Sequence, residues 1–185
     1  VSQQGSSALL YAAFGGHTEL VSYLIERGLS DINRKNDYND TPFLLACLNG
    51  HMKTAQLLEQ KGADVTAVGQ HGRSALHHAA YCGHTELVSY LIERGLDINR
   101  KDNPNKTPLY LACWRGKVDV VKLLIEKDAN VSIADEDGHT PLHSACQKGH
   151  TDIVEILLEH RARENIVDED GQIPLHTACQ EGYTD

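Results

Sequence analysis

Residues 140–150 read TPLHSACQKGH, and versions of this stretch recur along the whole chain. A tetrad similar to Thr-Pro-Leu-His begins nine residues before a glycine, which histidine follows in most cases. The glycines are Gly16, Gly50, Gly83, Gly116, Gly149 and Gly182, separated by 34 residues once and by 33 residues four times. The tetrads are Ser7-Ala8-Leu9-Leu10, Thr41-Pro42-Phe43-Leu44, Ser74-Ala75-Leu76-His77, Thr107-Pro108-Leu109-Tyr110, Thr140-Pro141-Leu142-His143 and Ile173-Pro174-Leu175-His176. The chain therefore has six registers of one 33-residue unit, the last of them truncated.

Each unit carries the signals of two short helices. The hydroxyl that opens the tetrad, as at Ser74, can cap a helix, and the proline at Pro108 fits a first helical turn. A glycine such as Gly83 ends that helix. Helices of about ten residues are unstable alone, so adjacent units must cover their apolar sides. Those sides are Leu76, Ala79 and Ala80 in the first helix, and Leu87, Val88, Leu91 and Ile92 in the second.

The period and the tetrad resemble the ankyrin-repeat family, whose signature is T-P-L-H-x-A. The resemblance covers essentially the whole chain and implies an all-α repeat solenoid. Each repeat would have two antiparallel helices and a β-hairpin finger, and the tetrad histidine would hydrogen-bond to nearby backbone and to the capping hydroxyl. We expect a single ankyrin-repeat domain over residues 1–185, with repeats at about 2–35, 36–68, 69–101, 102–134, 135–167 and a truncated 168–185.

Three of the second helices are expected to end at a glycine, as at Gly95. Asp128 and Arg161 replace it in the fourth and fifth repeats, where we expect a strained or differently closed turn. Ile173 replaces the capping hydroxyl in the last repeat, which should fray or expose apolar surface unless the protein continues. The chain starts without methionine and stops within a repeat, so we expect it to be a segment of a longer protein.

The charge of the chain argues against two classes of partner. The net charge of −9, from 17 basic and 26 acidic residues, disfavours nucleic acid and anionic membrane surfaces. The sequence has no apolar run of 18 residues and no signal peptide. We therefore expect an intracellular chain, in the reducing environment of the cytoplasm. We also expect it to be a monomer.

Neither the five cysteines nor the eleven histidines predict a metal or cofactor. Equivalent residues of stacked helices are about 8–10 Å apart, too far for a disulfide or for shared zinc ligation. Cys82 lies off the buried stripe, and it is the one cysteine that we expect to react with a thiol reagent. The other four share one register, where small buried side chains are expected: Cys47, Cys113, Cys146 and Cys179.

The sequence also lacks the motifs of common enzymes. There is no phosphate-binding glycine loop after a strand, no nucleophile elbow and no zinc-binding helix with two histidines. We therefore predict a non-catalytic scaffold that binds a partner protein or peptide along its concave face and fingers. Two alternatives are a structural spacer and a regulatory module of a larger multidomain protein.

One row of first-helix positions is the predicted binding site. At 100° per residue, Tyr81 lies about 140° from Leu76 and points away from the core. The row could instead lie against the neighbouring repeat's first helix. As a site, it would form an apolar groove for an extended or helical peptide, with buried aromatic and arginine side chains as its hot spots. The row is Phe14, Leu48, Tyr81 and Trp114, followed by Gln147 and Gln180, and its flanks are His78, Cys82, Arg115, Tyr38, His71 and Arg73.

Acidic residues are concentrated in the second part of the chain. Residues 102–185 carry 8 basic and 16 acidic side chains. The triplets at 135–137 and 168–170 lie one period apart and predict an acidic ladder on the fingers. The ladder could be only a solvated face; as a site, Asp137 and Asp170 would attract a basic segment of the partner.

The stretch around Asn99 suggests a modification. Leu91, Asp97, Ile98 and Asn99 resemble the stretch that asparaginyl hydroxylases modify in ankyrin repeats, although Arg100 departs from the usual small residue. The alternative is that Asn99 only forms hydrogen bonds within its loop.

Overall fold

The computed structural model describes residues 8–182; Ser7 of the first tetrad lies outside this range. Each repeat contributes one first helix, and each of the first five also contributes a second helix. The first helices are α1 (Ala8–Phe14), α3 (Pro42–Leu48), α5 (Ala75–Cys82), α7 (Pro108–Trp114), α9 (Pro141–Gln147) and α11 (Pro174–Gln180). The second helices are α2 (Thr18–Glu26), α4 (Met52–Gln60), α6 (Thr85–Glu93), α8 (Val118–Glu126) and α10 (Thr151–Glu159), and η1 (Gln70–Gly72) is a 3-10 turn.

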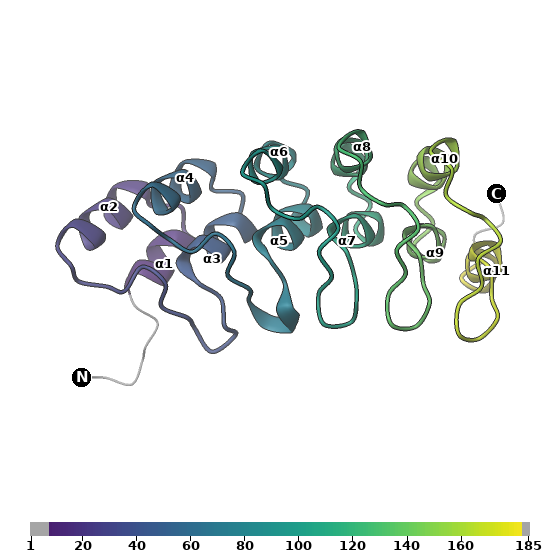
Figure 1. The fold of residues 1–185 in the computed structure, drawn as a ribbon, viewed down its shortest axis with the longest axis horizontal. Coiled ribbons are helices and arrows are strands. Elements are labelled where there is room, and N and C mark those ends of the chain that lie inside the picture. The colour runs from purple at the N-terminus through teal and green to yellow at the C-terminus, as the bar shows by residue number, and fades with distance from the viewer. Residues whose placement is uncertain (1–7, 183–185) are drawn as a thin grey trace. The chain divides into compact units, whose positions relative to one another are not determined.

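The helices form two compact units, Val1–Ala79 and Ala80–Asp185. In the first unit, α1 packs on α3 and α2 packs on α4. In the second unit, α7, α9 and α11 form one layer and α6, α8 and α10 form another, and the fingers project on the side of the first helices (Figure 1). Each helix therefore covers its apolar side with its own pair and with adjacent repeats, because it is too short to be stable alone.

The tetrad begins the first helices as expected. Thr107 Oγ1 accepts a hydrogen bond from the N–H of Tyr110 at 3.2 Å, and Pro108 occupies the first turn. His143 Nδ1 lies 2.9 Å from Thr140 Oγ1 and accepts from the N–H of Thr140 at 3.1 Å. Because Nδ1 accepts, the proton is on Nε2, which donates to the carbonyl of Gln172 at 3.1 Å. The tetrad histidine thus ties its own helix to the next finger.

The β-hairpin of the fingers is not confirmed. In each described finger the N–H of the first residue donates to the carbonyl of the fifth, as from Asp135 to His139 at 2.9 Å. The structure otherwise contains one isolated bridge in residues 8–182, between Val68 and Ser74. A ladder needs several successive residue pairs, and the two arms of a five-residue turn are too short to supply them.

The turns after the second helices close in one way, whichever residue is present. Asp128 and Arg161 adopt φ values of 64° and 65°, close to the 63° of Gly28. Of the two outcomes expected for these turns, the structure therefore agrees with the strained one, because both residues adopt the left-handed conformation that glycine adopts most easily.

Replacing Arg161 by glycine should raise the free energy of unfolding by about 1 kcal/mol, because glycine enters the left-handed region without a steric penalty. Urea denaturation followed by circular dichroism would measure the change. Gly95→Ala is the matched control: Gly95 has φ +80° and no atom within 4 Å of an added Cβ. It should lose a similar amount from backbone strain alone. A destabilised Arg161→Gly protein would show that the arginine side chain matters more than its backbone.

Within residues 8–182, no helix is long and apolar enough to cross a membrane. The core consists mainly of leucine, valine and alanine from both helix layers, with Phe43 as a large, fully buried ring. The last repeat differs, since Leu175 is 63% exposed. This exposure agrees with the expectation of apolar surface at that end.

Candidate functional site

The predicted row lies at or near the carboxyl ends of the first helices. In the first unit, Phe14 is 51% exposed and Leu48 is half-buried. In the second unit, Tyr81 and Trp114 are both half-buried. These side chains therefore lie at the surface of their units rather than in the core.

In the second unit, a cation lies over each of the two aromatic rings of the row. The guanidinium carbon of Arg115 lies 4.7 Å from the centre of the Tyr81 ring, and Lys148 Nζ lies 3.9 Å from the centre of the Trp114 ring. Each cation is the cap residue of the following first helix, α7 or α9, and reaches back over the ring of the preceding repeat. Such contacts are worth about 0.5–1 kcal/mol at exposed sites.

Lys148 is a candidate site residue that the sequence analysis did not identify. It stands one period after Arg115, directly after Gln147 of the row. The signal was therefore available in the register, but the row seemed to end where glutamine replaces the aromatic residues. Lys148 belongs to the candidate site because it reaches back over the Trp114 ring of the preceding repeat. The register of a single helix does not show this contact between repeats.

His78 does not flank an open groove, contrary to the expectation. It is only 9% exposed, and its register holds the buried residues Leu45 and Leu111 in other repeats. Its Nε2 lies 3.7 Å from Asp40 Oδ1. Burial, Arg73 and His77 lower the pKa of His78 to about 4, and burial raises the pKa of Asp40. His78 is therefore a core residue that no partner can reach in the folded chain.

The other finger residues of the first unit are at the surface. Tyr38 is 60% exposed and His71 is exposed, with a left-handed φ of 58°. Arg73 is half-buried. The fingers thus present the ring of Tyr38 and the imidazole of His71 to solvent.

The acidic triplets are divided between two roles. Asp135 Oδ1 accepts from the N–H of Asp137 at 3.2 Å and of His139 at 2.9 Å, so its carboxylate is buried inside the finger. Asp168 plays the same part in the next finger. The exposed carboxylates are Glu136, Asp137, Glu169 and Asp170.

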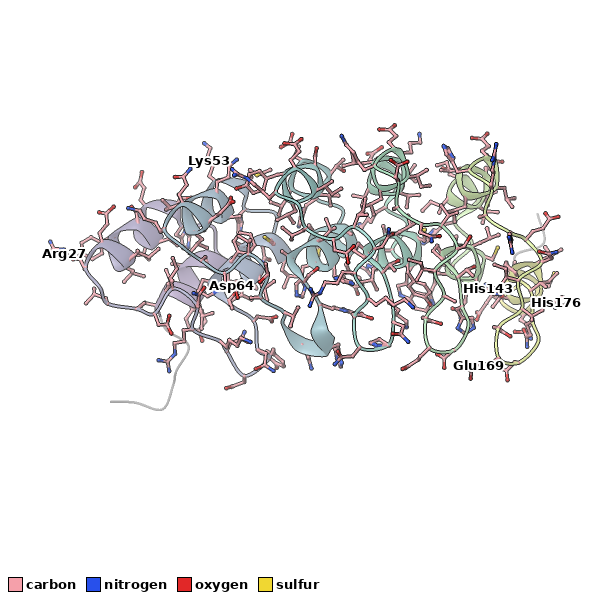
Figure 2. The ribbon with its side chains drawn as sticks, viewed as in Figure 1. Arg27, Lys53, Asp64, His143, Glu169 and His176 are labelled. Atoms are coloured by element: carbon pink, nitrogen blue, oxygen red, sulfur yellow. The ribbon has the colours of Figure 1, made fainter. Side chains whose placement is uncertain are left out.

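Adjacent fingers of the second unit are joined through their backbones. The N–H of Glu169 donates to the carbonyl of Asp137 at 3.1 Å, and the N–H of Glu136 donates to that of Pro104 at 3.1 Å. Glu169 points outward from the tip of its finger (Figure 2). The backbones of neighbouring fingers are thus held at a fixed spacing, and the acidic ladder stays a prediction.

One cluster has the residue types of a metal site. Ligand atoms of Asp135, Asp137 and His139 lie within 4.8 Å of one another. Side chains of the chain already contact these carboxylates, because Lys106 Nζ is 3.8 Å from Asp135 Oδ2 and His139 Nε2 is 3.3 Å from Asp168 Oδ2. A structural role in joining the fingers explains these contacts without an ion.

Two small hollows lie elsewhere, beside the beginnings of second helices. Their volumes are about 240 and 300 Å³, and they are lined by residues such as Lys117 and Asp119 or His150 and Asp152. Neither includes a residue of the predicted row.

Asn99 forms a bond between repeats. Its Oδ1 accepts from the N–H of Asn130 at 2.8 Å, as Asn33 Oδ1 does from Asp64 at 2.8 Å in the first unit. The side chain thus holds the next loop in place, and hydroxylation of Asn99 stays a prediction.

The expectation that Cys179 is buried is wrong, because Cys179 is exposed. In the part of the chain that the structure describes, no helix follows α11 to cover that face. Burial raises the pKa of Cys146 to about 11. It also raises the pKa of the half-buried Cys82, although Lys117 and Arg115 oppose the shift.

Alkylation should follow this order of exposure, since the thiolate is the reactive form. With iodoacetamide at pH 8, Cys179 should react first and Cys82 more slowly, and the other three cysteines should react only on unfolding. Peptide mapping by mass spectrometry at successive times would measure the rates. Labelling of Cys113 as fast as that of Cys179 would contradict the buried assignment.

Comparisons with known proteins agree with the geometry. A family model described as ankyrin repeats (3 copies) matches residues 1–69, 67–135 and 128–185. The chain is 38% identical over 77 residues to the probable E3 ubiquitin-protein ligase XBOS33 of Oryza sativa subsp. japonica, covering 41% of this chain and 15% of that protein. It is 35% identical over 79 residues to a transient receptor potential cation channel subfamily A member 1 homolog of Caenorhabditis elegans, covering 43% and 6%.

A third relative is the ankyrin repeat and KH domain-containing protein mask-1 of Caenorhabditis elegans. Its identity is 43% over 63 residues, covering 34% of this chain and 2% of that protein. The chain thus spans less than a fifth of the length of each of these relatives. Their differing names share no single activity.

Proposed function

The chain belongs to the ankyrin-repeat family, and on that premise we propose that it is a non-catalytic scaffold that binds a partner protein or peptide. Proteins of this family generally mediate protein–protein interaction. In each unit, the binding surface comprises the row residues at the ends of the first helices and the exposed fingers. The carboxylates Asp137 and Asp170 attract a basic segment of the partner, mainly raising its association rate.

The observation that supports this proposal is the pair of half-exposed rings, Tyr81 and Trp114, each lying under a cation of the next repeat. Aromatic and arginine side chains are the usual hot spots of interfaces. A structural spacer has no need of large rings at the surface, since the same register carries Gln147 and Gln180 in later repeats. The row therefore favours a binder over a spacer.

Trp114→Gln should weaken partner binding at least tenfold, the loss expected of a hot spot of about 2 kcal/mol. The substitution introduces the residue that the chain itself carries at 147 and 180. A partner is first captured with the intact chain and identified by mass spectrometry. Calorimetric titration of the purified partner then compares the two proteins.

The control is the thermal unfolding of the Trp114→Gln protein. It should melt within a few degrees of the original chain, because Trp114 is only half-buried. Undiminished affinity, or a melting temperature lowered as much as by a core substitution, would show that the ring serves packing rather than binding.

A further inference from the structure

We propose that the second unit binds an acidic segment of its partner along a basic-aromatic strip. This strip consists of Tyr81, Trp114, Arg115, Lys117 and Lys148. The inference rests on the proposed binding function and adds the chemistry of the partner. It concerns a part of the surface distinct from the acidic fingers.

Within the part of the chain that the structure describes, two cations of the strip lack a carboxylate partner. Among the interactions of residues 8–182, Arg115 and Lys148 form no ion pair with an aspartate or glutamate, and each lies over a ring instead. Arg115 is exposed and Lys148 is half-buried. Their positive charge is therefore available to a ligand.

The strip is positive within an acidic part of the chain. Residues 102–185 carry 16 acidic and 8 basic side chains, and three of these eight are Arg115, Lys117 and Lys148. The first helices there, with sequences PLYLACW, PLHSACQ and PLHTACQ, contain no aspartate or glutamate. The carboxylates of this part of the chain lie on fingers, second helices and loops; Asp119 among them lines one hollow together with Lys117.

A third cation, Lys117, and the thiol of Cys82 lie at the end of the strip that contains Tyr81. Lys117 and Arg115 both act on Cys82, which follows Tyr81. The side chain of Lys117 also lies against Gly83, where an added Cβ would meet its Cδ at 2.8 Å. Its aliphatic part thus packs on the glycine, which leaves the ammonium group at its end for a ligand.

Stacking prepares these side chains for a carboxylate. A guanidinium that lies over a ring keeps its N–H groups in its own plane, where they can donate in pairs to a carboxylate. The rings beside it offer apolar contact to the rest of the segment. The ligand of this strip is therefore a segment with aspartate or glutamate beside apolar side chains. A basic segment is repelled here and is drawn to the fingers instead.

The competing explanation is purely structural. Arg115 and Lys148 are cap residues of α7 and α9, where a positive charge is favourable near the last carbonyls. Glutamine at either position would then lower stability slightly and leave ligand binding unchanged. The two explanations therefore predict different binding results.

The test is a selection of displayed random 12-residue peptides on the whole chain. The selected peptides should be enriched in aspartate and glutamate, against the net charge of −9. Their affinity should fall at least tenfold for an Arg115→Gln, Lys148→Gln double variant. Lys122→Gln, Lys127→Gln is the matched control, because it removes the same charge on the side of α8. It should leave the affinity within about twofold.

The fluorescence of Trp114 can show whether an acidic peptide binds at the strip. Trp114 is the only tryptophan of the chain, and Lys148 lies on its ring. Titration with a selected acidic peptide should change the tryptophan emission, and its counterpart with glutamine in place of the acidic residues should change it at least tenfold less.

Two outcomes would overturn the proposal. Acidic peptides that bind the double variant as tightly as the original chain would place their site elsewhere. Selected peptides that are basic or uncharged would exclude an acidic ligand while leaving the scaffold function intact. If no peptide were selected and no partner captured, the scaffold function itself would fail together with the inference.

Discussion

Leu142→Ala should lower the free energy of unfolding by roughly 2–5 kcal/mol, the usual loss for a buried leucine. Leu142 is 2% exposed, and its helix α9 packs against both α7 and α11. Alanine would leave a cavity between close-packed helices that cannot collapse fully. Urea denaturation followed by circular dichroism would measure the loss.

The chain contains a matched control for this prediction. Leu175 occupies the same place in PLHTACQ that Leu142 occupies in PLHSACQ, and the two stretches differ at one position. Leu175 is 63% exposed, so Leu175→Ala should change the free energy by only about 0.5 kcal/mol. Equal losses at both positions would mean that the local helix, rather than packing between repeats, sets the effect.

Acidification from pH 6.5 to pH 4 should destabilise the protein, and His78 alone should contribute up to about 3 kcal/mol. The pKa of His78 is about 4 in the folded chain, below its ordinary value of 6.5. The unfolded chain therefore binds a proton over this range and the folded chain does not. The contribution of His78 to the free energy of unfolding is therefore fully present above pH 6.5 and is lost as the pH falls towards 4.

Asp40 acts in the opposite direction near its own pKa, which burial raises. The comparison is therefore made in an Asp40→Asn background. His78→Leu introduces the residue of the same register at Leu45 and Leu111 and should flatten the dependence of the unfolding free energy on pH. His143, whose pKa burial also lowers, contributes equally to both proteins. Parallel curves for the two proteins would show that His78 takes up its proton in both states alike.

The sequence predicted the helices well because their ends are decided locally. Thr107 and Pro108 begin α7 by a hydroxyl cap and a fixed φ. Gly116, with a φ of 66°, follows its end because glycine tolerates the left-handed region. The finger was predicted less well, since a ladder depends on how far its two arms run side by side.

The surface positions of the candidate site residues were predicted in part. Tyr81, Trp114 and Arg115 were identified from their register and lie at the surface of the second unit. Lys148 was missed and His78 was misplaced. Both errors concern contacts with an adjacent repeat or finger, which the periodicity of one helix does not contain.

The duplicated segment GHTELVSYLIERGL, at 16–29 and 83–96, separates the two kinds of information. Both copies form the same nine-residue helix, Thr18–Glu26 and Thr85–Glu93, and both end at a left-handed glycine. The sequence by itself determined this, because caps and backbone preferences act within a few residues. Burial differs: Leu20 is 44% exposed and Leu87 is 2% exposed. Only the tertiary structure decided that difference, since each repeat is covered by its neighbours and not by its own residues.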